Sequence, residues 1–401
     1  MNGQKLANRV KQISASITLA ITSKANELKK QGFPIISFGA GEPDFDTPQY
    51  IKNGAKKALD EGFTKYTSNV GILELRKAIC EKLDKENNLS YAPNQIIVSN
   101  GAKQSLFNSI FSICDDGDEV IIFSPYWVTY IDQVKLAGGI PVIVETKAED
   151  DFRINMDNFE AKITDHTKLV IINSPNNPSG AVYTRQELKK IAEIVKKYNL
   201  YVISDEIYEK IIYDTEHISI ASLNDDIKKR TIVINGFSKS FSMTGWRVGY
   251  LASIDAEILK AVDDIQSHLT SNANSIAQKA AFTALAQDSN YEFAPIIAKF
   301  KTKRNFIVKE LNSISNIFCP NPKGAFYVFP NIKGCFGKVY NGKIINTTMD
   351  FCNVLLDEKK VALVPGDAFG DKESVRISYA LSFENMIEGI TRITEFCNDL
   401  E

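Results

Sequence analysis

One stretch of the sequence combines a lysine with residue types that bind anions. A short apolar run, Thr231–Ile234, leads to Lys239, which directly follows Ser238 and precedes Arg247 by eight positions. Such a run indicates a buried strand, so the lysine is expected near the carboxyl end of that strand. In a partly dry site beside another cation, the pKa of a lysine falls and its amine can form a Schiff base with an aldehyde. A serine hydroxyl and a guanidinium suit a phosphate on the same ligand, although most lysines simply extend into solvent.

Seven short apolar runs alternate with helical patterns through the middle of the chain. They comprise residues 96–99, 119–123, 140–145, 169–172, 201–203, 231–234 and 248–252. This alternation predicts an α/β fold with a mostly parallel seven-stranded sheet covered by helices on both faces. Ligands of such sheets bind at the carboxyl ends of the strands. The residues that follow each run are therefore the candidate site.

These strand ends carry polar and aromatic side chains of several kinds. They are Gly101, Ala102 and Lys103 at the start of a helical pattern, Trp127, Asn177 in a turn, Asp205 and Tyr208. The free N–H groups at a helix start favour a phosphate, and a buried carboxylate requires a cationic partner. Each residue also has a simpler interpretation, since Trp127 can be core and Asn177 plain turn geometry.

Composition excludes several classes of protein. The 401 residues are 44% hydrophobic and 24% charged with a net charge of −2, which is ordinary for a globular protein and gives no support for a nucleic-acid partner. No apolar stretch has the length of a membrane span, and the start of the chain lacks a signal peptide. The six scattered cysteines form no CxxC pair, so we expect free thiols, a cytoplasmic location and no metal site.

The motifs around the lysine resemble a known family. The run Asn235-Gly-Phe-Ser-Lys239, followed by Met243-Thr-Gly-Trp-Arg247, is similar to the cofactor-lysine signature of class I pyridoxal-phosphate aminotransferases, and within them the bacterial-type aspartate aminotransferase branch. The similarity extends from Val10 to the C-terminal helix. It implies pyridoxal 5′-phosphate as cofactor, the type I fold of such enzymes, and transfer of the amino group of aspartate to 2-oxoglutarate in two half-reactions through a pyridoxamine form.

The resemblance assigns a role to each candidate residue. Lys239 would carry the cofactor and transfer the proton, Asp205 would pair with the pyridine nitrogen, and Tyr208 and Asn177 would contact the ring O3′. The remaining cofactor contacts implied are Gly101, Ala102, Lys103, Trp127, Ser238, Arg247 and Tyr66, the last reaching into a neighbouring subunit. The substrate contacts implied are Gly41, Trp127, Asn177, Lys103, and Arg376, which would clamp the α-carboxylate.

The resemblance also predicts small amino-acid and 2-oxo-acid substrates and a homodimer with shared active sites. Lys103 would meet the distal carboxylate of aspartate. The simpler alternative for Lys103 is a solvated lysine in the first turn of a helix. The simpler alternative for Arg376 is a solvated arginine on an edge strand. Gly236 replaces a hydroxyl found in some relatives, and Ser14 stands where prephenate-using relatives carry lysine. An aromatic or kynurenine-type aminotransferase, a carbon–sulfur β-lyase and a non-catalytic pyridoxal-binding protein remain open.

The order of the predicted elements suggests three segments. Residues 1–46 would form an N-terminal arm with part of a small domain, residues 47–285 a large cofactor-binding domain, and residues 286–401 a small α+β domain. In the last part the sequence predicts helices up to residue 312 and strands within 324–329, 361–365 and 374–380.

Overall fold

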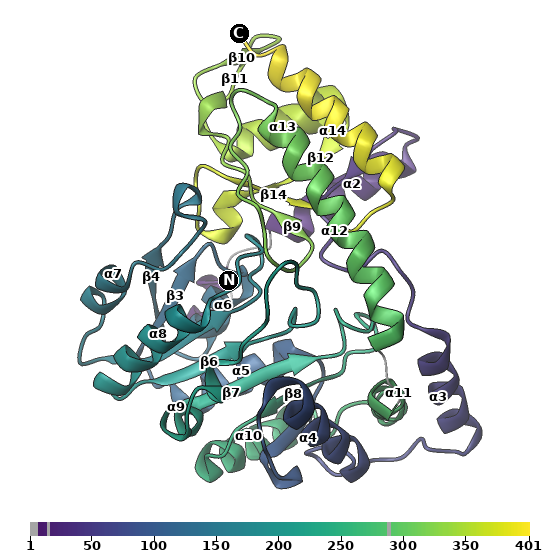
Figure 1. Ribbon diagram of the computed structural model, residues 1–401, viewed down its shortest axis with the longest axis vertical. Helices are drawn as coiled ribbons and strands as arrows, with labels where there is room; N and C mark the ends of the chain where they lie inside the picture. Colours follow the sequence, from purple (N-terminus) through teal and green to yellow (C-terminus); the bar gives the residue numbers. More distant parts are fainter. Residues whose placement is uncertain (1–6, 14–16, 287–289) are drawn as a thin grey trace, which may run out of the picture.

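The computed structural model describes residues 7–13, 17–286 and 290–401, and its central feature is a seven-stranded sheet (Figure 1). Ser14, on which the prephenate argument depends, lies outside the described residues. In spatial order the strands are β2 (Ile96–Ser99), β8 (Gly249–Ala252), β7 (Thr231–Gly236), β6 (Tyr201–Asp205), β5 (Thr167–Asn173), β3 (Glu119–Ser124) and β4 (Ile140–Glu145). All seven predicted strands are thereby confirmed.

The sheet is parallel except for β8, which pairs antiparallel with both β2 and β7. The central strands consist of β-branched and other apolar residues that are buried throughout, as strands covered on both faces require. The parallel register sets Asn173 opposite Asp205, and Asp205 opposite Ile234. Three strand ends therefore lie level at one edge of the sheet, where the candidate residues are expected.

Helices pack on both faces of this sheet, as the alternation predicted. Apolar residues of α5, α6 and α10 pack on one face, and those of α3, α4, α8 and α11 pack on the other. The helices that cover the sheet are α3 (Gln49–Asp60), α4 (Leu73–Asn87), α5 (Ala102–Ile113), α6 (Thr129–Leu136), α7 (Met156–Ala161), α8 (Arg185–Lys197), α9 (Asp225–Arg230), α10 (Ala256–Leu269) and α11 (Ser275–Ala286). Residues Thr184 and Glu187 form a capping box that fixes the start of α8.

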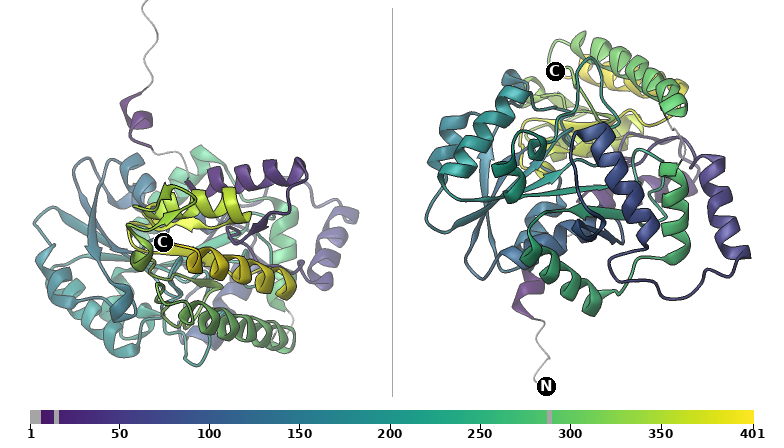
Figure 2. Two further views of the ribbon diagram at one scale, coloured as in Figure 1. Left: turned by 90° about the horizontal axis from the view of Figure 1, so that it is seen from above. Right: turned by 60° about the horizontal axis from the view of Figure 1, so that its bottom comes forward.

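The C-terminal part of the chain forms most of a second hydrophobic core. The long helix α12 (Asn290–Asn312) leads to it from the sheet in Figure 1, and helices α13 (Thr348–Lys359) and α14 (Phe383–Asn398) pack within it. The N-terminal segment joins this part, because β1 (Ile36–Ser37) pairs in parallel with β12 (Val361–Ala362). Figure 2 shows the purple helix α2 (Ile17–Lys30) beside the same C-terminal elements.

The smaller sheets differ in part from the prediction. The predicted strand over 361–365 is two strands in separate sheets, since β12 pairs with β1 while β13 (Val364–Pro365) pairs with β14 (Val375–Ser378). Strand β14 also pairs with β9 (Tyr327–Val328), and an unpredicted hairpin is formed by β10 (Val339–Tyr340) and β11 (Lys343–Ile344). The domain bounds at 47 and 285 stay a prediction. None of the described helices has the length and apolar content of a membrane span.

Candidate functional site

The lysine lies where the sequence placed it, in a loop just beyond the end of β7. Its ammonium donates a hydrogen bond to the carbonyl oxygen of Gly41 and lies 5.9 Å from the centroid of the Tyr208 ring. Burial is the main reason that the pKa of Lys239 falls to about 8, and the cations Arg376 and Arg247 act in the same direction. An amine with this pKa is partly unprotonated near neutral pH, as a nucleophile requires.

Asp205 lies at the end of β6 with its carboxylate buried. The Tyr130 hydroxyl donates to Asp205 Oδ2 at 2.6 Å, and the backbone N–H of Ile207 donates to Oδ1 at 3.3 Å. Burial raises the pKa of Asp205 to about 6, although both hydrogen bonds oppose this shift. Within the described part of the chain Asp205 forms no ion pair, so the carboxylate can accept a cation from a ligand.

Arg376 lies on β14, the central strand of its three-stranded sheet, and is only 4% exposed. Its Nη1 donates to Asn177 Oδ1 at 3.2 Å and its Nη2 donates to the carbonyl oxygen of Gly39 at 2.9 Å. The guanidinium carbon lies 4.8 Å from the ring centroid of Tyr327 and 4.9 Å from that of Phe369. The alternative of a solvated arginine on an edge strand is therefore wrong.

Tyr208 and Tyr327 form a second link between the sheet and the C-terminal part. Their hydroxyl oxygens are 3.0 Å apart and both side chains are buried. Burial raises the pKa of both phenols, so each keeps its proton at neutral pH and can donate it in a hydrogen bond. Asn177, Tyr208 and Arg376 thus approach one another from three separate elements.

The start of α5 meets Arg247, as an anion site would require. Gly101 has a φ of +84°, and a Cβ placed there would lie 2.5 Å from Arg247 Nη2, so only glycine fits this contact. A Cβ on Gly249 would likewise collide with the backbone nitrogen of Ala102. The free N–H groups of the helix start and a guanidinium therefore face the same place, which favours a phosphate there. Ser238, the residue before the lysine, is also buried.

Lys103 and Trp127 also contact each other. The Lys103 ammonium lies 4.9 Å from the Trp127 ring centroid, and the Trp127 ring packs edge-on against Tyr130 with 5.5 Å between centroids. Part of the Lys103 side chain stays exposed, yet partial burial, followed by the charge of Arg247, lowers its pKa. Trp127 is only partly buried, so its ring is accessible to a ligand.

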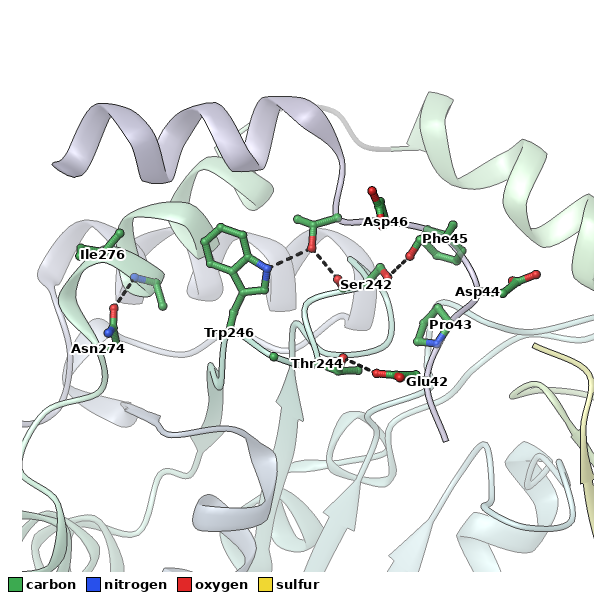
Figure 3. Close-up of a pocket in the computed structure, with 13 residues that line it drawn as sticks. Glu42, Pro43, Asp44, Phe45, Asp46, Ser242, Thr244, Trp246, Asn274 and Ile276 are labelled. Atoms are coloured by element: carbon green, nitrogen blue, oxygen red, sulfur yellow. Dashed lines mark hydrogen bonds between the residues drawn. The ribbon is translucent and has the colours of Figure 1, made fainter. Parts of the chain in front are cut away.

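The segment from Glu42 to Thr47 is hydrogen-bonded to residues 242–246, which follow Lys239 (Figure 3). Thr244 Oγ1 donates to Glu42 Oε2 at 2.9 Å, Thr47 Oγ1 donates to the carbonyl oxygen of Ser242 at 2.6 Å, and Trp246 Nε1 donates to Thr47 Oγ1 at 3.0 Å. A cavity of about 740 Å³ lies between this segment and the start of α11, and none of the thirteen predicted site residues lines it. This cavity adjoins the candidate site without being part of it.

Tyr66 is the predicted residue that lies apart from the others. It belongs to the loop between α3 and α4, and its side chain is 90% exposed. A side chain so exposed encloses nothing in a single chain, so the structure of one chain does not test the expected contact across a subunit boundary.

Sequence analysis missed two residues that the structure brings into the site, Tyr130 and Tyr327. A weak signal existed for Tyr130, because it follows Trp127 by three positions at the start of α6, and residues three apart share one face of a helix. Tyr327 lies in a run of apolar residues that predicts only a buried strand. Its contact with Tyr208 joins positions 119 residues apart, which no local pattern can show.

The arrangement fits pyridoxal phosphate in three respects and a substrate carboxylate in a fourth. A buried carboxylate without a cation, Asp205, suits a protonated pyridine nitrogen, and the start of α5 with Arg247 suits the phosphate. Lys239 supplies the amine. Arg376 is a buried cation whose Nε finds no acceptor among the described residues, which suits a substrate carboxylate.

Comparisons with known proteins agree with this geometry. The model of the family "Aminotransferase class I and II" matches residues 34–393. The chain is 46% identical over 393 residues to the aspartate aminotransferase of Bacillus subtilis (strain 168), covering 98% of both chains. It is 45% identical to a probable aspartate/prephenate aminotransferase of Aquifex aeolicus, covering 98% of this chain and 99% of that protein.

A solved structure is similar over its entire length. The crystal structure of the aspartate aminotransferase from Rhizobium meliloti superposes with a TM-score of 0.96 at 41% identity, covering 100% of each chain. The fold, the lysine signature and the family match all agree, and this chain is a class I and II aminotransferase, an enzyme family that depends on pyridoxal phosphate.

Proposed function

We propose that the protein transfers the amino group of L-aspartate to 2-oxoglutarate. The observation that carries the proposal is the position of Lys239, whose pKa is about 8, among buried Asp205, Tyr208 and Arg376. The relatives named aspartate aminotransferase support aspartate as the donor. The choice of 2-oxoglutarate as acceptor rests on the resemblance of the sequence alone.

Each residue has a task in this reaction. When bound, pyridoxal phosphate supplies an aldehyde for the amine and a ring that accepts the electron pair left when the substrate Cα loses its proton. Asp205 would keep a proton on the pyridine nitrogen, and Tyr208 and Asn177 would hold the ring oxygen through hydrogen bonds. Lys239 would hold the cofactor and would act as the base that takes the proton from the substrate Cα, a role that a pKa of about 8 suits.

Substrate binding is assigned to two cations. Arg376 would hold the α-carboxylate through its planar guanidinium, since its Nε has no acceptor among the described residues. The aromatic rings of Tyr327 and Phe369, which contact the guanidinium, fix its orientation. Lys103, beside Trp127, would meet the side-chain carboxylate of aspartate. Gly41 would offer its backbone to the substrate α-carboxylate. Its carbonyl oxygen accepts a hydrogen bond from Lys239.

A visible absorption spectrum tests the proposal directly. The purified protein with pyridoxal phosphate should show the band of a lysine-bound aldehyde, and aspartate should convert it to the pyridoxamine form more readily than phenylalanine or prephenate does. Conversion mainly by phenylalanine would favour an aromatic aminotransferase, and rapid reaction with prephenate would extend the substrate range. Absence of any band would contradict the proposal.

Lys103→Ala tests the assignment of the distal carboxylate. Loss of a charge-assisted hydrogen bond of roughly 2 kcal/mol should raise the KM for aspartate by about 30-fold while leaving phenylalanine almost unaffected. Lys189→Ala, which removes an exposed lysine on α8, is the matched control and should change neither value. Equal loss with both substrates would show that Lys103 acts on the cofactor instead.

We further propose a homodimer with shared sites, because Tyr66 is 90% exposed and would otherwise contact nothing. Chains carrying Tyr66→Ala and chains carrying Lys239→Ala should each be weakly active or inactive. After unfolding and refolding together, hybrid dimers should contain one intact site and regain about a quarter of the wild-type activity per chain, as random pairing requires. No recovery, in a mixture shown to be dimeric by light scattering, would contradict the shared site, because Tyr66 would then not complete the site of the other chain.

A further inference from the structure

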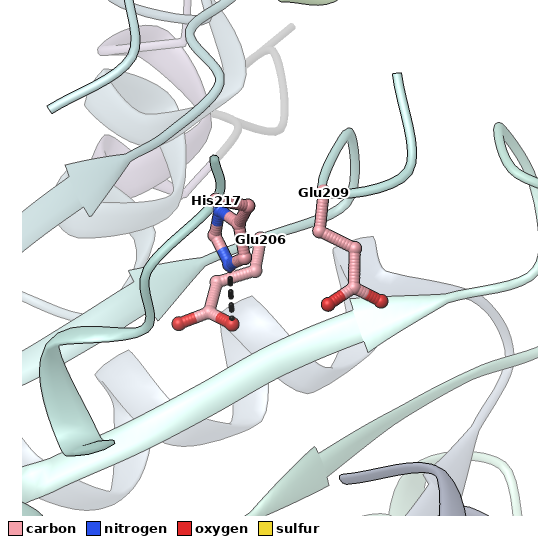
Figure 4. Close-up of side chains that lie close together, drawn as sticks. All are labelled: Glu206, Glu209 and His217. Carbon is pink, nitrogen blue, oxygen red and sulfur yellow. Dashed lines mark hydrogen bonds and ion pairs between the residues drawn. The ribbon is translucent and has the colours of Figure 1, made fainter. Parts of the chain in front are cut away.

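A buried cluster of ionisable side chains lies next to Asp205 and Tyr208 in the sequence. Glu206, Glu209 and His217 follow β6, and one ligand atom of each lies within 4.8 Å of the others (Figure 4). Glu206 is 1% exposed and Glu209 is 7% exposed. Two carboxylates and an imidazole at this spacing are also what a metal site offers, so the partners of each atom decide between the two interpretations.

All four carboxylate oxygens already have donors from the chain. Lys82 contacts Glu209 Oε1, and Asn87 Nδ2 donates to Glu209 Oε2 at 2.8 Å. The hydroxyls of Ser204 and Ser219 donate to Glu206 Oε1 at 2.9 and 2.6 Å, and His217 Nε2 lies 3.1 Å from Glu206 Oε2. A metal ion would have to displace Lys82, so the cluster is an ion network rather than a metal site.

The network pairs acidic with basic side chains. Lys82 faces Glu209, and the negative charges of Glu206 and then Glu209 raise the pKa of His217 although its burial acts in the opposite direction. Glu206 therefore favours the protonated form of His217. Buried carboxylates that are paired and fully hydrogen-bonded hold their surroundings rigidly, since breaking any one contact leaves a charge without a partner.

The same short segment carries two of the proposed cofactor contacts on its other side. Asp205 faces Tyr130 of α6, while Glu206 and Glu209 face α4 and the chain before residue 220. The backbone between them is a tight turn, because the N–H of Glu209 donates to the carbonyl oxygen of Glu206 at 2.9 Å. Movement of either glutamate would therefore move the carboxylate of Asp205 and the hydroxyl of Tyr208.

We propose that Glu206 and Glu209 are positioning residues, which fix the turn so that Asp205 and Tyr208 meet the cofactor ring correctly. The inference rests on the proposed function, because it gives these two side chains a cofactor to meet. Neither glutamate touches the site itself. Their effect is transmitted through the backbone of the turn from Glu206 to Glu209. A displacement of a catalytic group by about 1 Å can reduce the reaction rate by about 100-fold.

Two variants test this inference. Glu206→Gln keeps the size of the side chain and removes its charge, and the double variant Lys82→Gln/Glu209→Gln replaces the second ion pair without leaving a buried lysine unpaired. For both we expect an affinity of the cofactor-free protein for pyridoxal phosphate that is lower by about 10-fold or more. The pH titration of the visible band of the cofactor-bound protein should also shift by at least half a pH unit.

Glu187→Gln is the matched control, since it breaks the Glu187–Arg153 pair on α8, away from the site. It should lower the thermal unfolding temperature yet leave cofactor affinity and the band titration unchanged. If the two network variants behave like this control, the network is merely structural and the inference is wrong. If wild-type protein binds no pyridoxal phosphate at all, the proposed function fails as well. Wild-type binding with unchanged variants overturns the inference alone.

Discussion

Asp205 and Glu209 are buried carboxylates four residues apart, yet their surroundings are opposite. Among the described residues, the carboxylate of Asp205 accepts hydrogen bonds only from the neutral Tyr130 hydroxyl and a backbone N–H, and its pKa rises to about 6, mainly because of burial. Burial also raises the pKa of Glu209, but the charge and hydrogen bond of Lys82, with help from His217 and Asn87, lower it to about 2. Within the part of the chain that the structure describes, Glu209 forms an ion pair with Lys82 and Asp205 forms none.

The difference separates a structural acid from a ligand-binding acid. A carboxylate with its own lysine stabilises the fold and has no capacity left for a ligand. A carboxylate buried without a cation destabilises the cofactor-free protein and regains that free energy when a cationic ring binds. The comparison therefore predicts opposite consequences when each charge is removed.

Removing the charge of Asp205 should affect catalysis most. Asp205→Asn cannot keep a proton on the pyridine nitrogen, so we expect kcat to fall by roughly 10²- to 10³-fold, the effect of losing one partner of a buried ion pair. The cofactor-free variant should be at least as stable as wild type, because the amide still accepts the Tyr130 hydrogen bond and no buried charge remains. Transamination rates and urea unfolding of the cofactor-free protein measure the two effects.

A cofactor-free Asp205→Asn protein that is clearly less stable than wild type would contradict the comparison. Asp205 would then contribute to folding like any paired acid. Glu119→Gln is a suitable control for substitution of a strand carboxylate. Glu119 lies at the first residue of β3, and its carboxylate accepts hydrogen bonds from the hydroxyls of Thr164 and Thr167.

Removing the charge of Glu209 should affect folding most. A pKa of about 2 in the folded state, against an ordinary value of 4.5, stabilises the protein by about 3 kcal/mol above pH 4.5. This stabilisation decreases as the pH falls from 4.5 towards 2. Glu209→Gln should therefore lose about 3 kcal/mol of unfolding free energy at pH 7, and less as the pH is lowered.

Urea unfolding of the cofactor-free protein between pH 7 and pH 3 measures this effect. A difference between wild type and Glu209→Gln that stays constant over the whole range would mean that the lost stability comes from packing and not from the charge. The sign is opposite for Asp205, whose raised pKa adds stability only at low pH. That contribution is lost as the pH rises from about 4 to about 6.

The sequence was sufficient for one side of this comparison and not for the other. Asp205 and Lys239 could be predicted because both follow apolar strands, and parallel strands end at one edge of a sheet. Glu206 and Glu209 stand beside Asp205 in the sequence, but Glu209 is paired with Lys82 and Asn87, which lie more than 120 residues before it. Without that contact, two glutamates after a strand indicate a solvated turn.

The same limit explains the errors in the C-terminal part. The run 361–365 was predicted as one strand, yet Val361 pairs with Ile36 while Val364 pairs with Arg376. A change of partner within five residues is decided by segments far away in the chain, and periodicity cannot detect it. Arg376 was identified only through the resemblance, because an arginine between apolar residues ordinarily indicates an exposed face.

Tyr130→Phe should produce the smallest change of the three variants, because it alters only the pKa of Asp205 and leaves the carboxylate in place. It removes the neutral donor at 2.6 Å and leaves the burial of Asp205 unchanged, so the pKa of that carboxyl should rise above about 6. A hydrogen bond to a charged group contributes about 1.5 kcal/mol, which corresponds to about one pH unit. Protonated Asp205 cannot pair with the pyridine cation. Cofactor affinity should therefore decline at a pH about one unit higher than in wild type, as measured by titration of the cofactor-free protein from pH 5 to pH 8.

Tyr213→Phe is the matched control for this variant, because Tyr213 is also a buried phenol, and its hydroxyl donates at 2.6 Å to the carbonyl oxygen of Ala325. It should reduce stability by about 1 kcal/mol and leave the pH dependence of cofactor binding unchanged. If both variants leave that pH dependence unchanged, Asp205 does not depend on Tyr130 for its charge, and burial alone distinguishes it from Glu209. If only Tyr130→Phe shifts it, a single neutral hydroxyl keeps an otherwise unpaired carboxylate ionised until the cofactor binds.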